Sequence, residues 1–363
     1  MSSALNNRLD IKNNHWLDVC RASAILLVLL SHSRRLLFPV FPDAQLFKFG
    51  GFLGVEVFFV LSGFLIGSII IEKSSGSECR WRWIPNFLGR RFLRTYPNYI
   101  LFFFLNWLVI DSWRPEAMPE LWRYMTFTQS LFSAHPEFFG EAWSLVVEEV
   151  FYFIIPLVMF ITWRGSAIQA LLITLFILLA YSLFMRVALV CLEPELTFNQ
   201  VRSTALLRLD SIMIGVLTSY FYYHGKLWRE RLIKVSPFLS LLLIPVVVIS
   251  MQPDKVMDES LFFKVFLFPI ANLAAAGLLV SGMKLRVNNL FYRLVRPVAR
   301  WSYSAYLVNL LVLSAMGFYL PKVTVDTAIL YWLGFIFTTL MLSAVTYNYF
   351  ERNILLWRDH WIK

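Results

Sequence analysis

The sequence predicts an all-α membrane protein, a polytopic bundle of about ten transmembrane helices. Of the 363 residues, 58% are hydrophobic and only 15% are charged, and the mean hydropathy is +0.63. So few charged residues cannot cover the surface of a soluble domain of this length. Apolar stretches long enough to cross a bilayer recur along the whole chain, with no long soluble segment between them. We therefore expect one membrane domain over residues 1–363 and no appended soluble domain.

The predicted transmembrane helices follow one another as apolar segments separated by short loops. Their bounds are 16–33, 52–71, 96–111, 143–163, 167–190, 204–223, 235–251, 262–282, 302–320 and 326–349. The third is short, and residues 112–141 after it are rich in Trp, Phe and Pro, which favours an interfacial or partly re-entrant position. No cleavable signal peptide is expected, because the first segment carries Arg21 and lacks a small-residue cleavage site.

The distribution of basic residues predicts the orientation. Of the 33 Lys and Arg residues, 21 lie in the N-terminal segment and in the segments on the same side of the predicted bundle. Because basic residues accumulate on the cytoplasmic side, both termini are predicted to be cytoplasmic. The net charge of +10 then indicates contact with anionic membrane lipid rather than with nucleic acid, for which there is no motif. The three cysteines lack metal-ligand spacing, and we expect no metal.

Arg21 and His32 bracket an apolar run in the first predicted span. They are about three helical turns apart, so both side chains project from one face, about 16 Å from each other along the axis. Ionisable residues within a span are costly unless they are paired or hydrated. The two residues therefore indicate a polar path through the bilayer. The alternative is an arginine that reaches the membrane surface and a histidine bonded to a backbone carbonyl.

The loop before the third span ends in a basic cluster, Arg90, Arg91 and Arg94, which we call the arginine triad. On a helix these three positions are predicted to share one side. Guanidinium groups bind phosphate oxygens in pairs, so the triad indicates a site for a nucleotide-bearing cofactor or a lipid head group. The alternative is a topology signal that contacts anionic lipid.

A polar stripe is predicted at the start of the fourth span. Ser144, Glu148 and Tyr152 are spaced i, i+4, i+8 and so lie on one face of a helix. A carboxylate entering the membrane needs a partner on another helix, or it stays protonated. His32 is a candidate partner, because a carboxylate can orient an imidazole. The alternative is a hydrated interfacial glutamate.

Further polar residues fall inside predicted spans. Glu56 is a candidate buried acid, and Ser62 and the glycines around it permit close helix packing. Arg208 and Asp210 are close in sequence but lie on different faces of a helix, so each is expected to have its own partner. Arg186 is a candidate mate for one of the acids.

Together these segments resemble the membrane-bound acyltransferase 3 family, in the right order over nearly the whole chain. The matching motifs are Leu17-Asp18-x-x-Arg21 through His32, Gly54-Val55-Glu56-x-Phe58-Phe59-x-x-Ser62-Gly63-Phe64 (with Glu56 at the family's Asp position), Arg90-Arg91-x-x-Arg94 with Pro97, Trp143-Ser144-Leu145 through Glu148 and Phe151-Tyr152, Arg208-x-Asp210, and Ser302-Tyr303-x-x-Tyr306-Leu307.

The resemblance implies a multi-pass enzyme of the bacterial cytoplasmic (inner) membrane. Such an enzyme moves an acyl group, usually acetyl, from cytoplasmic acetyl-coenzyme A (acetyl-CoA) to an acceptor hydroxyl. The implied acceptor is a glycan or lipid-linked glycan, such as lipopolysaccharide O-antigen or exopolysaccharide.

By this analogy the arginine triad engages the cofactor phosphates and Arg21 guides or polarises the thioester. His32 acts as general base, with Glu148 orienting it. The residues expected to support the site or line the substrate path are Asp18, Glu56, Ser62, Ser144, Tyr152, Arg208, Asp210, Tyr303 and Asn309.

The chemistry of thioester transfer agrees with this assignment. It needs a base that is neutral near physiological pH and a cation facing the developing oxyanion. No Ser or Cys lies in a nucleophile elbow, so direct transfer is preferred over a covalent intermediate. Asn309 stands where the family often has a His, and it can hydrogen-bond but carries no proton at neutral pH. A structural hydrogen bond is the expected role of Asn309 and of Glu351.

Two other functions fit some of the same residues. A proton-coupled transporter would also carry buried charges, but the sequence shows no inverted repeat and a transporter leaves the arginine triad unexplained. An O-acyltransferase acting on a small metabolite or a lipid is the second alternative, because no residue distinguishes these acceptors from a glycan.

Overall fold

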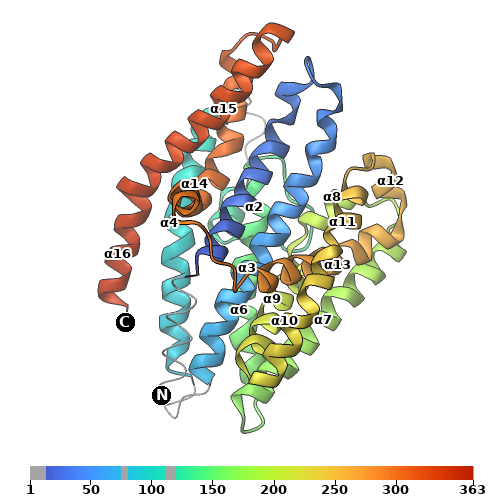
Figure 1. Cartoon of the computed structure of the whole chain (residues 1–363), viewed down its shortest axis with the longest axis vertical. Coiled ribbons are helices and arrows are strands. Elements are labelled where there is room, and N and C mark those ends of the chain that lie inside the picture. The colour runs from blue at the N-terminus through green and yellow to red at the C-terminus, as the bar shows by residue number, and fades with distance from the viewer. Residues whose placement is uncertain (1–13, 75–80, 112–119, 363) are drawn as a thin grey trace.

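The computed structural model describes residues 14–74, 81–111 and 120–362 (Figure 1). The described chain is helical and contains no β-strand, which confirms the all-α prediction. Its helices are α2 (His15–Ser33), α3 (Lys48–Ser74), α4 (Trp83–Asp111), α5 (Leu121–Met125), α6 (Trp143–Ile161), α7 (Ala167–Leu192), α8 (Phe198–Ser203), α9 (Leu209–Tyr223), α10 (Lys226–Leu241), α11 (Leu243–Ser250), α12 (Asp254–Glu259), α13 (Leu261–Ser281), α14 (Asn289–Tyr319), α15 (Val325–Thr346) and α16 (Arg352–Trp361).

Eight helical segments of the described chain are long and apolar enough to cross a membrane. They are His15–Leu37, Pro42–Ser74, Gly140–Ile161, Ala167–Leu192, Lys226–Ser250, Leu261–Ser281, Asn289–Tyr319 and Val325–Trp361. A polytopic membrane protein was predicted correctly, but with about ten spans. The two remaining predicted spans correspond to α4 and α9, which are helices at the expected places.

The physical reasons for this difference are local. The first half of α4 carries the arginine triad, which lowers its hydropathy. Helix α9 has only 15 residues, about 22 Å of helix, because the predicted first helical turn is replaced by a short 3-10 helix, Ala205–Leu207. Nearly every side chain of α9 is buried by its neighbours, so this helix does not need to match the thickness of the lipid.

Helix α3 lies at the centre of the bundle and packs against α2 and α9 (Figure 1). Glycines make its crossing with α9 possible. A Cβ atom on Gly63 would lie 2.0 Å from the Ile212 carbonyl oxygen, and one on Gly215 would lie 2.3 Å from the Val60 carbonyl oxygen. Close packing was the expected role of the glycines in this segment, and the structure confirms it.

Two ion pairs are buried beside this crossing. Arg208 of α9 contacts Glu56 of α3 at 2.6 Å, and neither side chain is exposed. Arg186 of α7 binds both carboxylate oxygens of Asp210, at 2.8 and 2.6 Å. The structure therefore confirms that Arg208 and Asp210 have different partners and that Arg186 pairs with one of the acids.

The segment after α4 was expected to lie in the interface or to re-enter the membrane. Residues 112–119 lie outside the described residues, and the part from residue 120 to α6 packs against α4. The ring centroids of Phe127 and Phe139 lie 4.3 and 5.4 Å from that of Tyr99. Both phenylalanines have positive φ angles, 53° and 49°, which is costly for such bulky side chains, so this packing holds the backbone in place.

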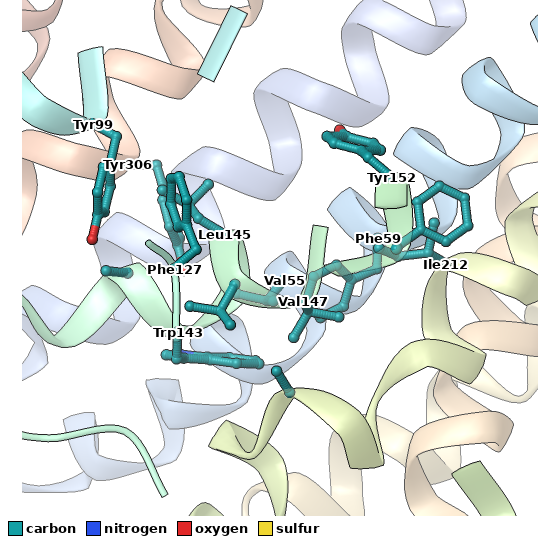
Figure 2. Close-up of a cluster of buried hydrophobic side chains, with 14 of the residues drawn as sticks. Val55, Phe59, Tyr99, Phe127, Trp143, Leu145, Val147, Tyr152, Ile212 and Tyr306 are labelled. Carbon is teal, nitrogen blue, oxygen red and sulfur yellow. The ribbon is translucent and has the colours of Figure 1, made fainter. Parts of the chain in front are cut away.

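These aromatic residues belong to a larger buried cluster that reaches across the bundle (Figure 2). Tyr99 lies at one side of the cluster and Phe59, Tyr152 and Ile212 at the other, with Trp143, Val55 and Val147 between them. The cluster connects α3, α4, α6 and α14, and these helices also line a polar cavity.

The glycine crossing can be tested by adding one methyl group. Gly63→Ala is expected to lower the apparent Tm of the detergent-purified protein, because overpacking against backbone atoms costs about 1–3 kcal/mol. Gly317→Ala in α14 is the matched control, since nothing lies within 4 Å of a Cβ there and alanine favours a helix over glycine. Equal Tm values for the two variants would contradict the packing described.

Candidate functional site

A cavity opens between α2, α3, α4, α6 and α14 and encloses about 770 Å³, including its open mouth. We call it the arginine cavity. It is lined by Arg21, Val55, Phe58, Phe59, Leu61, Ser62, Leu65, Arg91, Arg94, Thr95, Ser144, Leu145, Glu148, Tyr152, Ser302, Tyr303 and Tyr306. Five separate helices thus supply one set of polar side chains within an apolar bundle.

Three guanidinium groups face the arginine cavity. Arg21 pairs with Asp18, one turn earlier on α2, at 3.1 Å. Arg91 lies 5.6 Å from the ring centroid of Phe87, close enough for a cation–π contact. Arg94 lines the cavity with an exposed side chain. In the described chain neither Arg91 nor Arg94 has a carboxylate within ion-pair distance, so both remain available for an anion.

Arg90 departs from the predicted arrangement. Its guanidinium points to the C-terminal end of the chain, where it binds Asp359 at 2.6 Å and the carbonyl of Ile362. Consecutive residues on an α-helix are rotated by about 100°, so Arg90 and Arg91 diverge when the helix is packed on both sides. The expectation that the whole triad shares one face is therefore wrong for Arg90.

The predicted stripe on α6 faces the same cavity. Tyr152 donates a hydrogen bond to the Glu148 carboxylate at 3.0 Å, and Ser62 of α3 also hydrogen-bonds that carboxylate. Ser144 is bonded to the Tyr306 hydroxyl of α14 at 2.8 Å. The stripe is thus confirmed as one polar face, with partners on α3 and α14.

A second layer of hydrogen bonds fixes the arginine cavity from behind. Tyr303 donates to the Thr95 carbonyl at 2.7 Å. Glu351, at the end of a π-helical turn between α15 and α16, accepts hydrogen bonds from Ser304 at 2.7 Å and Asn98 at 2.9 Å. The expected structural hydrogen bond of Glu351 is therefore confirmed.

A second cavity, which we call the histidine cavity, lies at the other end of α2 and encloses about 1150 Å³, including its opening. It is lined by Ser31, His32, Arg34, Lys48, Gly51, Phe52, Thr197, Phe198, Asn199, Arg202, Ser250, Asp254, Met257 and Asp258. Arg21 and His32 therefore face two different cavities rather than one continuous polar path.

Aromatic side chains separate the two cavities. The Trp143 ring lies 5.9 Å from that of Phe59, which lines the arginine cavity, and 5.1 Å from the guanidinium of Arg202, which lines the histidine cavity. Trp143, Phe59 and Tyr306 all belong to the buried cluster in Figure 2. A reaction that uses both cavities must pass this thin aromatic layer.

The partner of His32 is Asn309 rather than the expected Glu148. The Nδ1 atom of His32 lies 2.5 Å from Oδ1 of Asn309, which is fully buried in α14. Glu148 lines the arginine cavity and does not line the histidine cavity. Asn309 has the expected hydrogen-bonding role, and its partner is the candidate base.

Sequence reasoning missed Arg202. Its Nη2 atom donates to the Gly51 carbonyl at 2.6 Å, and its buried Nε atom has no hydrogen-bond partner in the described chain. Burial lowers the pKa of Arg202 to about 10, so the side chain stays charged at neutral pH. A usable signal existed, because Arg202 is one of few basic residues in the predicted outer segments, where basic residues are disfavoured.

The remaining predicted site residues have supporting positions. Glu56, Arg208 and Asp210 lie in the buried ion pairs and line neither cavity. Asp18 holds Arg21 and accepts a hydrogen bond from Tyr292 at 2.8 Å. No group of three or more His, Cys, Asp or Glu residues in the described ranges is arranged to bind a metal.

Comparison with known proteins gives one family. A family model described as an acyltransferase domain matches residues 14–348. The chain is 30% identical over 167 residues to the peptidoglycan O-acetyltransferase OatA of Listeria monocytogenes, covering 40% of this chain and 24% of that protein. It is 23% identical over 359 residues to the O-acetyltransferase OatA of Staphylococcus aureus, covering 93% of this chain and 56% of that protein. The chain thus spans about half or less of the length of these relatives. No solved structure matches it.

The supporting role of the buried ion pairs can be tested by breaking one. Arg208→Met leaves the Glu56 carboxylate buried without its cation, which costs about 3–5 kcal/mol, so we expect a large fall in apparent Tm. Adding Glu56→Gln to this variant removes the unpaired charge and should recover much of the lost Tm. Lys255→Met, which breaks the exposed pair with Glu259, is the control and should leave Tm unchanged. Loss of function in Arg208→Met at an unchanged Tm would instead place Arg208 in the reaction.

Proposed function

The chain belongs to the acyltransferase family whose model spans residues 14–348, and from this premise we propose that it is an integral-membrane O-acyltransferase. Its proposed reaction moves an acetyl group from acetyl-CoA to a hydroxyl group of an envelope glycan. The observation that carries this proposal is the placement of Arg21 and His32 on one helix, each facing its own cavity. Two separate spaces along one helix would let a donor and an acceptor approach each other from different sides.

The arginine cavity suits the donor. Arg91 and Arg94 offer guanidinium donors that form no ion pair within the described chain, although Glu148 lines the same cavity, and such donors fit the phosphate groups of coenzyme A. Phe58, Phe59 and Leu65 line the same space and would contact the less polar arm of the donor. Arg90, held by α16, plays no part in this binding.

The histidine cavity suits the acceptor. His32 faces a space lined by hydroxyl, amide and charged side chains together with the rings of Phe52 and Phe198. Aromatic faces combined with hydrogen-bonding groups match the apolar faces and hydroxyl groups of a sugar. The names of the relatives, which include peptidoglycan O-acetyltransferase, support a glycan acceptor.

His32 would act as the general base. As the acceptor oxygen attacks the thioester carbonyl carbon, His32 takes the hydroxyl proton, the new C–O bond forms and the C–S bond breaks. The proton then passes from His32 to the departing thiolate, which balances the reaction as an ester and a free thiol. No covalent acyl-enzyme is needed.

Two different cations would serve the two ends of the donor. Because Arg21 and His32 are about 16 Å apart along α2, one arginine cannot contact both the entry of the donor and the reacting carbonyl. Arg21 would guide the arm of the donor. Arg202, which shares the histidine cavity with His32, is positioned to stabilise the developing oxyanion.

We place the arginine cavity on the cytoplasmic side of a bacterial cytoplasmic membrane and the histidine cavity on the outer side. The excess of basic residues in the segments on the side of the N-terminus supports this orientation. In Figure 1, α2 begins and α16 ends in the lower half of the molecule, so the two ends of the described chain lie toward the same side.

Donor binding is tested by thermal stabilisation. Acetyl-CoA at a concentration well above Kd should raise the apparent Tm of the purified protein by several degrees, since a hundredfold excess over Kd corresponds to about 2.7 kcal/mol. An Arg91→Ala/Arg94→Ala variant should lose this shift because it lacks the two phosphate donors. Arg90→Ala is the matched control and should keep it.

The control separates two explanations of a negative result. If only Arg90→Ala lost the acetyl-CoA-dependent rise in Tm, the phosphate site would lie near α16, and the assignment of the arginine cavity to the donor would be contradicted. No shift in the unmodified chain at millimolar acetyl-CoA would favour the transporter alternative over acyl transfer.

The base is tested by His32→Ala. We expect transfer of labelled acetyl from acetyl-CoA to the envelope glycan fraction to fall by about 10²–10⁴-fold, the usual contribution of a general base. The acetyl-CoA-dependent rise in Tm should persist, because His32 does not line the donor cavity. An unimpaired His32→Ala enzyme would remove His32 from the chemistry.

A further inference from the structure

Every polar atom of the Asn309 side chain is engaged. Its Nδ2 atom donates to the carbonyl oxygens of Ala305 at 3.2 Å and Tyr306 at 2.6 Å, and its Oδ1 atom faces Nδ1 of His32 at 2.5 Å. The side chain is fully buried, so water cannot substitute for any of these partners. Asn309 therefore has a single satisfactory orientation.

This orientation determines the proton position on His32. If the amide were flipped, its oxygen would face two carbonyl oxygens, and acceptor would meet acceptor. With Oδ1 toward the imidazole, Nδ1 of His32 must be the donor. A neutral imidazole carries one N–H, so Nε2 then holds the free lone pair.

We propose that Asn309 is a positioning residue that holds His32 as the Nδ1–H tautomer and so makes Nε2 the atom that receives the acceptor's proton. This inference rests on the proposed O-acyltransferase function. It assigns to Asn309 the orienting part of a catalytic triad without the charge that an aspartate would bring.

The neighbours of His32 hold the end of α2 in register with this contact. Ser31 donates to the Lys48 carbonyl at 3.2 Å, and Trp332 of α15 donates to the Ser33 hydroxyl at 3.1 Å. The residues on both sides of His32 are therefore bonded to different helices. The imidazole is left with one fixed nitrogen and one nitrogen available for chemistry.

The chemical consequence is that the proton enters and leaves His32 through Nε2. Asn309 cannot accept a proton, so the proton taken by Nε2 cannot leave through Nδ1. It must return from Nε2 to the thiolate released when the C–S bond breaks, or to water in the histidine cavity. A histidine or an acid at position 309 would open a second exit.

The charges around His32 do not replace Asn309. The charged side chains that line its cavity are Arg34, Lys48, Arg202, Asp254 and Asp258. Asp254 pairs with Lys48 at 2.8 Å, and Asp258 accepts a hydrogen bond from the Phe198 amide at 2.7 Å. The two carboxylates are thus committed elsewhere, and Tyr306, the titratable side chain nearest to Asn309 on α14, binds Ser144. No carboxylate that lines the cavity therefore takes the place of Asn309 beside the neutral imidazole, which is the form that acts as a base.

The pH dependence of acetyl transfer tests the proposal. Asn309→Asp keeps an oxygen on Nδ1–H but sets its second oxygen against the Ala305 and Tyr306 carbonyls, so it should retain more activity than Asn309→Leu, and ionisation of the new carboxylate would move the acid limb of kcat/KM to higher pH. Asn309→Leu, of similar volume, should lower kcat/KM by about tenfold or more without that upward shift. Asn106→Leu is the control, because Asn106 is also buried and, within the described residues, donates to the Phe102 carbonyl of its own helix, and its profile should match that of the unmodified chain.

A second measurement does not depend on activity. Nitrogen-15 spectra of histidine-labelled unmodified protein, with the His32 signals assigned by their loss in His32→Gln, should show a protonated Nδ1 and an unprotonated Nε2. An Nε2–H tautomer, or an Asn309→Leu enzyme with an unchanged kcat/KM, would overturn the proposal. If the spectra show Nδ1–H while the protein transfers no acetyl, the positioning contact stands and the proposed function fails.

Discussion

A charged side chain inside a membrane bundle needs a partner or water, and this constraint divides the charged residues of the chain into two groups. Glu56 with Arg208 and Arg186 with Asp210 neutralise each other out of contact with solvent and tie α3, α7 and α9 together. The second group faces the two cavities, where Arg21 and Lys48 have partly exposed partners and Arg91 and Arg94 form no ion pair in the described chain. The ion pairs hold α3 against α9. Because residues of α3 also line both cavities, the ion pairs help to fix the position of the cavity walls.

The two ends of helix α2 face the two different cavities. Arg21 at one end shares a cavity with Arg91 and Arg94, and His32 at the other end shares a cavity with Arg202. Between them lies an aromatic layer rather than an open channel, and in the proposed reaction this layer would keep water away from the thioester. The two cavities differ in character as the two substrates would, one cationic and partly apolar, the other mixed in charge and rich in hydrogen-bonding groups.

Sequence reasoning succeeded where the physical cause is local or periodic. Spacing alone placed Ser144, Glu148 and Tyr152 on one face of a helix, and it also predicted separate partners for Arg208 and Asp210, which lie on different faces. It failed where a side chain's partner lies on a segment distant in the sequence. The turn of Arg90 toward the chain's last residues depends on α16 folding back along α4, and the pairing of His32 with Asn309 depends on the packing of α2 against α14. Arg202 was missed because a six-residue helix between longer ones carries little periodic signal.

A structure of the His32→Ala protein with bound acetyl-CoA tests the account most directly, because this variant should bind the donor and not consume it. We expect phosphate density against Arg91 and Arg94, with the thioester end directed through the aromatic layer beside Trp143 toward the histidine cavity. Phosphate density beside Arg202 in the histidine cavity, or a thioester directed away from α2, would contradict the division of the site into a donor and an acceptor cavity.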